Sequence, residues 1–269
     1  MSAVTTGWGA ARQDPPGHPR AEERDLQIAG LVPLSSVDWP GRLAAVAFCQ
    51  GCPWRCTYCH NPAILDPRVP GAVPFAQVEA LLERRRGLLD GIVFSGGEAT
   101  AQHALVPAVR RVRDMGFAVG LHTGGAFPTR LRTLLGLGPA GEQTEAPLVD
   151  WVGFDVKAAP GGYEALVRRR GAWERTRASL DMLLASGVDH ELRMTLTPQL
   201  VDQVPAVIDL LAESGARGLV LQQARPDGAA AEFAAGLSAA PDWPGMFTST
   251  AEAAQRHGDT RGVTVTVRR

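Results

Sequence analysis

The residues of this sequence that are best suited to chemistry lie in one short segment, CQGCPWRCTYCHNP, at positions 49–62. It contains all four cysteines of the 269-residue chain, with the spacing Cys-x2-Cys-x3-Cys-x2-Cys. Disulfides among such close neighbours would close only small loops and would constrain little of the chain. We therefore expect these thiols to bind metal or to react, as clustered cysteines do in a reducing compartment.

The spacing of the cysteines distinguishes between kinds of metal site. A structural zinc site usually joins two Cys-x2-Cys pairs by a loop of about a dozen residues, whereas three residues separate the pairs here. A ferredoxin-type carrier needs a remote fourth cysteine, which this sequence lacks. Cys52, Cys56 and Cys59 remain, and three thiolates could hold three irons of a [4Fe-4S] cluster while the fourth iron stays open to a ligand. Cys49 is expected to be a small buried residue outside this set.

The segments around the cysteines alternate between apolar runs and helical spacing. Runs typical of buried parallel strands occur at residues 43–48, 91–94, 118–121, 149–156, 192–196 and 218–221. Helical spacing occurs at residues 75–89, 104–115, 129–135, 173–185 and 204–213. This α/β alternation predicts a partial (βα)6 TIM-like barrel with mainly parallel strands; a doubly wound open sheet is the alternative. Further strands are expected at residues 27–32 and, at an edge, 263–267.

Polar segments follow the predicted strands at the end where such barrels carry their chemistry. The second strand leads into SGGEAT at residues 95–100, and the third into HTGGAFP at residues 122–128. Gly96 and Gly97 would let the backbone approach a ligand closely, and the Glu98 carboxylate could accept hydrogen bonds from an ammonium group. We expect these loops and the cysteine segment to form one site.

Asp155 and Lys157 end the fourth predicted strand. Because side chains alternate along a strand, Trp151, Asp155 and Lys157 are expected to face the barrel interior, while the apolar residues between them face the helices. Lys157 is the one lysine among 27 basic residues, so a compact point charge is retained where the chain elsewhere uses arginine. The pair is predicted to bind a cofactor, with a purely structural ion pair as the alternative.

The Cys52-x3-Cys56-x2-Cys59 loop after the first barrel strand resembles that of the radical S-adenosylmethionine (SAM) superfamily. The resemblance implies a [4Fe-4S] cluster whose open iron is chelated by the methionine moiety of S-adenosyl-L-methionine. It also implies that Tyr58 lies beside the adenine; packing within the loop is the alternative. Residues 95–98, SGGE, look like the superfamily's GGE motif, in which Gly96, Gly97 and Glu98 bind the cofactor's amino group. Thr123, Asp155 and Lys157 complete the implied cofactor-binding residues, with Lys157 also counted as catalytic beside the three cysteines.

Several segments narrow the resemblance. VPLSSVDWPGRLAAVAFCQGC, CTYCHNP, GIVFSGGEAT, FDVKAAP and LQQARP, spread over residues 32–226, are similar to the activating proteins of anaerobic ribonucleoside-triphosphate reductase. That family implies reductive cleavage of SAM, a glycyl radical formed on the partner reductase, and a low-potential electron donor such as flavodoxin or ferredoxin. One departure is His122, which stands where these proteins usually carry Asp in a D-T-N-G loop, so cation binding there is in doubt.

Two other functions remain open. One is radical SAM chemistry on a small molecule, a peptide or RNA, and the other is a non-catalytic iron–sulfur or zinc module. The net charge of −1 and pI near 6.6 give no electrostatic reason to expect nucleic acid or a membrane as a partner.

The remaining expectations concern location and the chain ends. No run approaches the roughly 18 apolar residues of a membrane helix, and a cytoplasmic location is expected. Residues 1–25 are predicted to be a disordered tail and residues 26–269 the barrel domain. The arginine runs at 84–86 and 168–170 are expected to be solvated helix faces.

Overall fold

Eight strands in sequence order form one sheet in the computed structural model, which describes residues 22–269. The strands are β1 (Ile28–Ser35), β2 (Ala44–Cys49), β3 (Gly91–Gly96), β4 (Ala118–Thr123), β5 (Trp151–Asp155), β6 (Asp189–Leu196), β7 (Gly218–Gln223) and β8 (Thr264–Arg268). β1 pairs antiparallel with β2, and every later pair is parallel. β1 and β8 are the two edges, so the barrel is partial, as the sequence predicts.

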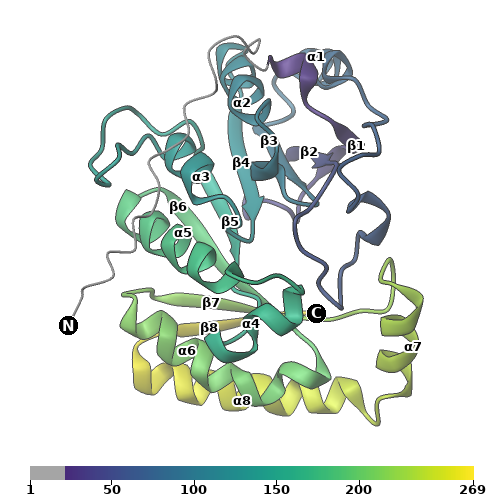
Figure 1. Cartoon of the computed structure of the whole chain (residues 1–269), viewed down its shortest axis with the longest axis vertical. Coiled ribbons are helices and arrows are strands. Elements are labelled where there is room, and N and C mark those ends of the chain that lie inside the picture. Colours follow the sequence, from purple (N-terminus) through teal and green to yellow (C-terminus); the bar gives the residue numbers. More distant parts are fainter. Residues whose placement is uncertain (1–21) are drawn as a thin grey trace, which may run out of the picture.

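Helices connect the parallel strands and cover the outside of the sheet (Figure 1). They are α1 (Phe75–Arg84), α2 (Leu105–Asp114), α3 (Pro128–Leu134), α4 (Pro160–Val167), α5 (Ala172–Ser186), α6 (Val204–Glu213), α7 (Ala231–Ala239) and α8 (Trp243–Arg261). Prolines in the first turn of α3, α4, α6 and α8 favour helix starts, because their missing N–H would be unpaired there. None of the helices in residues 22–269 is long and apolar enough to cross a membrane.

The two faces of the sheet carry different cores. Val152 and Phe154 of β5 are fully buried in the large apolar core against the helices. Trp151, one position away, faces the interior and stacks on Trp39 with ring centroids 5.9 Å apart. The predicted alternation of side chains along β5 is thus confirmed.

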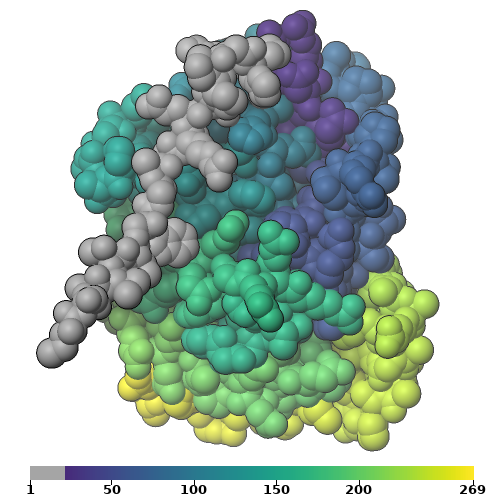
Figure 2. All heavy atoms as spheres, viewed as in Figure 1, coloured from purple at the N-terminus to yellow at the C-terminus, as the bar shows by residue number. Residues whose placement is uncertain are grey.

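In Figure 2, green residues of α4 and α5 fill the middle of the helical face, and the segment around α7 lies at the lower right.

The parallel register brings the strand ends to one level. Cys49 at the end of β2 pairs with Gly96 of β3, and Thr123 at the end of β4 pairs with Phe154. Asp155 at the end of β5 pairs with Arg193 of β6. Loops that follow these residues therefore start close to one another at one rim of the sheet.

The six predicted parallel strands all form, and the two additional strands lie at the edges. Three helices were not predicted, α4, α7 and α8. The buried residues of α8 are Trp243, Phe247, Ala251, Ala254 and Gly258, and the small side chains of the last three hide the helical period from a hydropathy pattern. The predicted tail lies outside the described residues up to residue 21, and residues 23–25 form the short 3-10 turn η1.

Leu131→Ala should test the helix-facing core, because Leu131 in α3 is fully buried and alanine keeps the helix propensity high. We expect the free energy of unfolding in guanidinium chloride to fall by about 2–5 kcal/mol. Leu88→Ala is the control, since Leu88 is 46% exposed, and it should change stability by less than about 0.5 kcal/mol. Equal losses in the two variants would contradict the assignment of this core.

Candidate active site

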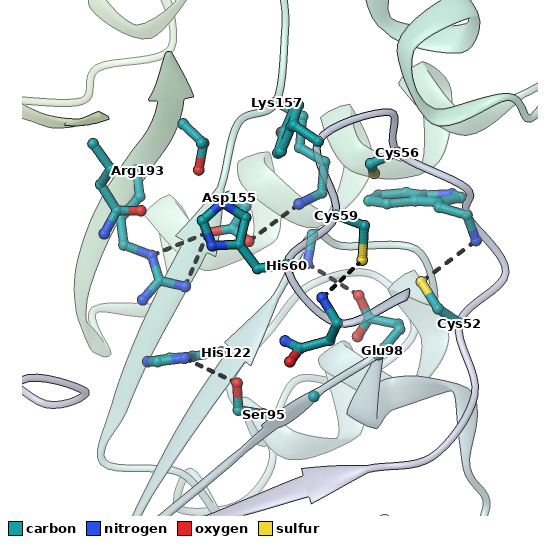
Figure 3. A pocket seen from close by; sticks show the side chains of 18 of the residues that line it. Cys52, Cys56, Cys59, His60, Ser95, Glu98, His122, Asp155, Lys157 and Arg193 are labelled. Carbon is teal, nitrogen blue, oxygen red and sulfur yellow. Dashed lines mark hydrogen bonds and ion pairs between the residues drawn. The ribbon is translucent and has the colours of Figure 1, made fainter. Parts of the chain in front are cut away.

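A pocket of about 300 Å³ opens at the rim where the parallel strands end (Figure 3). Every predicted site residue lines it, and these are Cys52, Cys56, Tyr58, Cys59, Gly96, Gly97, Glu98, Thr123, Asp155 and Lys157. Residues from β6, β7 and β8 complete the lining, including Arg193, Thr195, Gln222, Gln223, Arg225, Arg268 and Arg269. The structure therefore brings together side chains that are up to 105 positions apart in the predicted set, from Cys52 to Lys157.

The four cysteines divide into three and one. Cys52, Cys56 and Cys59 are partly exposed and line the pocket, whereas Cys49 is fully buried within β2 and does not. The backbone N–H of Trp54 donates to the Cys52 sulfur at 3.4 Å, and that of Asn61 donates to the Cys59 sulfur at the same distance. N–H donors of this kind stabilise a thiolate ligand. Within residues 22–269 no three Cys, His, Asp or Glu side chains are grouped to hold a single metal ion.

The chemistry of this donor set fits an iron–sulfur cluster. Burial and, to a lesser extent, the negative charge of Glu98 raise the pKa of Cys52 from 9.0 to about 12. Burial also raises the pKa of Cys56, although the Lys157 charge opposes the shift. Buried thiols become thiolates when a soft, positively charged metal centre balances their charge. Cys52, Cys56 and Cys59 are the residues that would hold such a centre.

The cysteine loop is held by its own backbone. The N–H of Gly51 donates to the Ile64 carbonyl at 2.7 Å, and the N–H of Cys52 donates to the Leu65 carbonyl at 3.1 Å. The Arg55 guanidinium points back into the loop and donates to the carbonyl of Cys52 at 2.9 Å. These bonds close the loop without using any cysteine sulfur.

Glu98 connects three loops of the site. It is 3% exposed, and its Oε1 accepts hydrogen bonds from the hydroxyls of Thr100 and Thr123 at 2.5 and 2.7 Å and from the Thr100 N–H. Its Oε2 accepts from the N–H of Gly124 at 3.0 Å. Burial raises the pKa of Glu98, and these hydrogen bonds oppose the rise. Since a carboxylate oxygen has two lone pairs, Oε2 keeps one acceptor site for a ligand.

The glycines beside Glu98 are required by close packing. Gly96 has a φ of +111°, and a side chain there would collide with the backbone of Cys49. A Cβ on Gly97 would collide with the Gly51 carbonyl and lie 3.2 Å from the Cys52 Cβ. The GGE segment therefore packs directly on the start of the cysteine loop, and the approach to a ligand that the glycines predict remains a prediction.

Asp155 lies between two cations. Its Oδ1 is 2.9 Å from Nη2 of Arg193, and its Oδ2 is 3.2 Å from Nζ of Lys157. Burial alone would raise the pKa of Asp155, but the charges of Arg193 and Lys157 outweigh it and lower the pKa. Burial alone would lower the pKa of Lys157, and the neighbouring Asp155 raises it above its ordinary value. The three groups are therefore charged together.

Lys157 also faces the cysteine loop. Its Nζ lies 5.9 Å from the ring centroid of Trp54 and 6.0 Å from that of Tyr58. Both rings are almost fully buried, so the ammonium group is oriented by Asp155 on one side and by aromatic faces on the other. Lys157 thus links the end of β5 to the segment between the cysteines.

His122 occupies the inner wall of the pocket. Its Nε2 is 2.8 Å from the Asp38 carbonyl, which can only accept, so Nε2 carries the proton and Nδ1 accepts from the Ser95 hydroxyl at 3.2 Å. Burial and, to a lesser extent, the charge of Arg193 lower the pKa of His122 from 6.5 to about 3. The imidazole is therefore neutral, unlike the Asp that the resemblance would place here.

Arg193 is the functional residue that sequence reasoning missed. It is 7% exposed, and a Cβ on Gly153 would lie 2.7 Å from its Nη1, so Gly153 makes room for the guanidinium. The sequence pattern could have identified Arg193 as a residue that faces the pocket. Arg193 and Thr195 alternate with apolar residues along β6, as Asp155 does along β5.

Comparison with known families agrees with this geometry. Residues 46–211, more than half of the chain, match the family described as the Radical SAM superfamily. The chain belongs to the radical SAM superfamily, and membership implies the [4Fe-4S] cluster and SAM as cofactors. The predicted resemblance is confirmed at this level.

Related proteins carry different names. A Methanocaldococcus jannaschii protein, provisionally named a glycyl-radical enzyme activating enzyme, is 28% identical over 65% of this chain and 70% of its own length. A pyruvate formate-lyase-activating enzyme of Clostridium pasteurianum is 30% identical over 37% of this chain and 43% of its own. A PqqA peptide cyclase of Methylobacterium sp. is 30% identical over 76% of this chain, which spans only 52% of the cyclase.

Solved structures support the fold. QueE from Escherichia coli superposes with a TM-score of 0.51 at 17% identity, covering 90% of this chain and 93% of QueE. Streptococcus suis SuiB, bound to its precursor peptide SuiA, superposes with a TM-score of 0.61 at 12% identity, covering 82% of this chain and 47% of SuiB. At these identities the likeness concerns the fold alone.

Alanine substitutions should separate the four cysteines. After anaerobic reconstitution with iron and sulfide, the wild type and Cys49→Ala should each bind about four irons per chain. Cys52→Ala, Cys56→Ala and Cys59→Ala should each lose the cluster absorbance and most of the iron. Loss of the cluster in Cys49→Ala alone would overturn the division into three and one.

His122 should make the stability of the protein depend on pH. Its pKa is lower in the folded state than in the unfolded chain, so below about pH 6.5 only the unfolded chain binds this proton. Stability from this group is therefore complete above pH 6.5 and is lost as the pH falls toward 3. Between pH 7 and 5 the loss should be on the order of 2 kcal/mol.

The matched variant is His122→Gln, which cannot titrate but can still donate to the Asp38 carbonyl. The free energy of unfolding of both proteins is measured in guanidinium chloride at pH 7 and at pH 5. Between these pH values it should fall less in the variant than in the wild type, by the contribution of His122. An identical fall in both proteins would show that His122 is protonated in the folded state.

Proposed function

We propose that this protein is a glycyl-radical-enzyme activase that cleaves SAM reductively and forms a glycyl radical on a partner protein, anaerobic ribonucleoside-triphosphate reductase. The observation that carries the proposal is the convergence of the cysteine loop, the GGE segment and the Asp155–Lys157 pair on one pocket. Two of the relatives carry the name of an activating enzyme, and this chain matches one of them over 70% of that relative's length. These names support the same class of reaction.

The chemistry available with the cofactors bound is transfer of one electron to the sulfonium, whose C–S bond breaks to give methionine and a 5'-deoxyadenosyl radical. The chain's own residues would position the reactants and exclude water. Glu98, with one free acceptor site on Oε2, is placed to receive the methionine ammonium beside Gly96 and Gly97. Because Glu98 cannot move without breaking its bonds to Thr123 and Gly124, that acceptor is fixed before the cofactor binds.

The charged trio has a complementary role. Asp155 stays ionised between Arg193 and Lys157, and its carboxylate can accept from ribose hydroxyls at the pocket wall. One carboxylate against two cations leaves one positive charge, so the same wall can also receive a carboxylate. These are the two partners that an adenosyl-methionine molecule would bring.

The partner reaction would take place at the mouth of the pocket. Hydrogen transfer from a glycine Cα to the deoxyadenosyl carbon gives 5'-deoxyadenosine and leaves the unpaired electron on the glycine. Gln222 and Gln223 at the end of β7 and Arg225 after it line the pocket and carry donors suited to a polypeptide backbone. Reduction of the protein by a flavodoxin or a ferredoxin would supply the electron.

A peptide substrate is the second candidate. The peptide cyclase matches 76% of this chain, and the same backbone-binding mouth would serve a peptide as well as a loop of a folded reductase. A small-molecule or RNA substrate has no comparable support in the pocket lining.

The proposal is tested by mixing the reduced, reconstituted protein and SAM with a candidate anaerobic reductase. We expect release of deoxyadenosine and a glycyl doublet in electron spin resonance, since hydrogen abstraction leaves the radical on the partner. Cys49→Ala should retain both signals and Cys52→Ala should lose both. A reductase with its radical glycine changed to alanine is the control for the doublet. Cofactor cleavage without a doublet on any reductase, but with modification of an added peptide, would replace this proposal by the second candidate.

A further inference from the structure

A second cavity lies on the other side of the cysteine loop. This groove, of about 800 Å³, is bounded by the cysteine loop, by α4, by η4 (Pro198–Gln203) and by α7. Its lining includes Cys56 and Cys59, which also line the active-site pocket. The two cysteines thus form a wall between the pocket and the groove, and the groove is a second approach to the metal-binding sulfurs.

The rim of the groove is basic. Arg55 and Arg168 line it, and Arg169 and Arg170 follow directly in the chain; all four are exposed. Within the part of the chain that the structure describes, no ion pair neutralises any of them. Glu232 on α7 is the one acidic side chain in the lining. The rim therefore carries an excess of positive charge, although the net charge of the chain is −1.

The floor of the groove is apolar. It contains Leu166 of α4, Leu200 of η4, and Phe233 and Leu237 of α7, and the Phe233 ring lies 6.4 Å from that of Tyr58 in the cysteine loop. An apolar floor inside a charged rim is the usual composition of a protein–protein contact. The apolar floor also suits the apolar edge of a planar aromatic cofactor better than it suits a fully polar group.

Arg168 is held in an unfavourable backbone conformation. It ends α4 with φ 55° and ψ 42°, the left-handed region that glycine adopts without strain, and its N–H bonds the Glu164 carbonyl. A glycine would be the better residue for this helix end, so the stability of the fold does not explain the arginine. The strained backbone of Arg168 therefore points to a role of its side chain at the rim.

The rim is connected to the cysteine loop by the backbone. The N–H of Arg55, between Cys52 and Cys56, donates to the carbonyl of Val167 at 2.9 Å, and Val167 directly precedes Arg168. A protein seated on the arginine turn would therefore contact the segment that carries the sulfurs. No other described cavity reaches these cysteines from outside the active-site pocket.

We propose that this groove docks the electron donor, an acidic flavodoxin-type protein whose flavin edge enters the apolar floor while its acidic surface faces Arg168, Arg169 and Arg170. The inference rests on the proposed radical chemistry. The donor gives up one electron, which enters the site at the Cys56–Cys59 wall; the sulfonium C–S bond breaks, methionine leaves with the electron pair, and the adenosyl carbon keeps the unpaired electron.

The test measures binding directly. An acidic flavodoxin is titrated into the reconstituted protein at low ionic strength, and its Kd is determined by calorimetry. Arg169→Ser/Arg170→Ser should raise the Kd by about tenfold and reduce its salt dependence. The sequence provides a matched control in its other RRRG run: Arg84→Ser/Arg85→Ser, near the end of α1, should leave the Kd unchanged.

Arg168→Gly separates binding from stability. Because glycine accepts the left-handed conformation, the melting temperature of this variant should be no lower than that of the wild type, while donor binding weakens. A merely structural arginine would give the opposite pattern, a lower melting temperature with unchanged binding.

The kinetic readout compares deoxyadenosine formation driven by reduced flavodoxin with that driven by dithionite. The ratio of the two rates should fall in the rim variants and stay constant in the control. If dithionite supports cleavage but the Kd and the ratio do not respond to the rim arginines, the docking inference fails and the proposed chemistry stands. If no reductant supports cleavage, the proposed function itself fails. Binding of a short RNA in competition with flavodoxin would reassign the groove to nucleic acid.

Discussion

The active site depends on one buried carboxylate. Glu98 accepts hydrogen bonds from Thr100 in its own loop and from Thr123 and Gly124 in the loop after β4. Gly97, directly before it, packs against the start of the cysteine loop. Breaking these contacts would leave a charge unpaired at 3% exposure, which is strongly unfavourable, so the three loops keep one arrangement relative to one another.

The second buried charge, on Asp155, is stabilised differently. Glu98 is surrounded by neutral donors and its pKa rises, whereas Asp155 lies between two cations and its pKa falls. The two carboxylates of one pocket therefore have opposite electrostatic environments. Arg193 and Lys157 together cause the difference, because the guanidinium from β6 contacts Oδ1 of Asp155 and the ammonium group contacts Oδ2.

Much of the fold could be predicted from the sequence, because buried parallel strands appear as short continuous apolar runs and helices with large apolar residues show a clear period. The period fails where small residues do the packing, as with Ala251, Ala254 and Gly258 in α8. The part of the site that lies in sequence motifs was predictable, since all ten residues named from those motifs line one pocket. The neutral state of His122 was not predictable, because it follows from burial of the ring and from the charge of Arg193, 71 positions away in the chain.

The cysteine loop must satisfy opposite requirements on its two sides. Toward the pocket, its sulfurs have to remain available as ligands, and toward the groove the same segment has to form a closed surface. The loop meets both because its shape is fixed without the thiols: Arg55 bonds the Cys52 carbonyl, and Gly51 and Cys52 bond Ile64 and Leu65. These bonds hold the loop beside the two backbone N–H groups that donate to the sulfurs of Cys52 and Cys59. A metal centre can therefore gain or lose charge there while the backbone of the loop keeps its contacts.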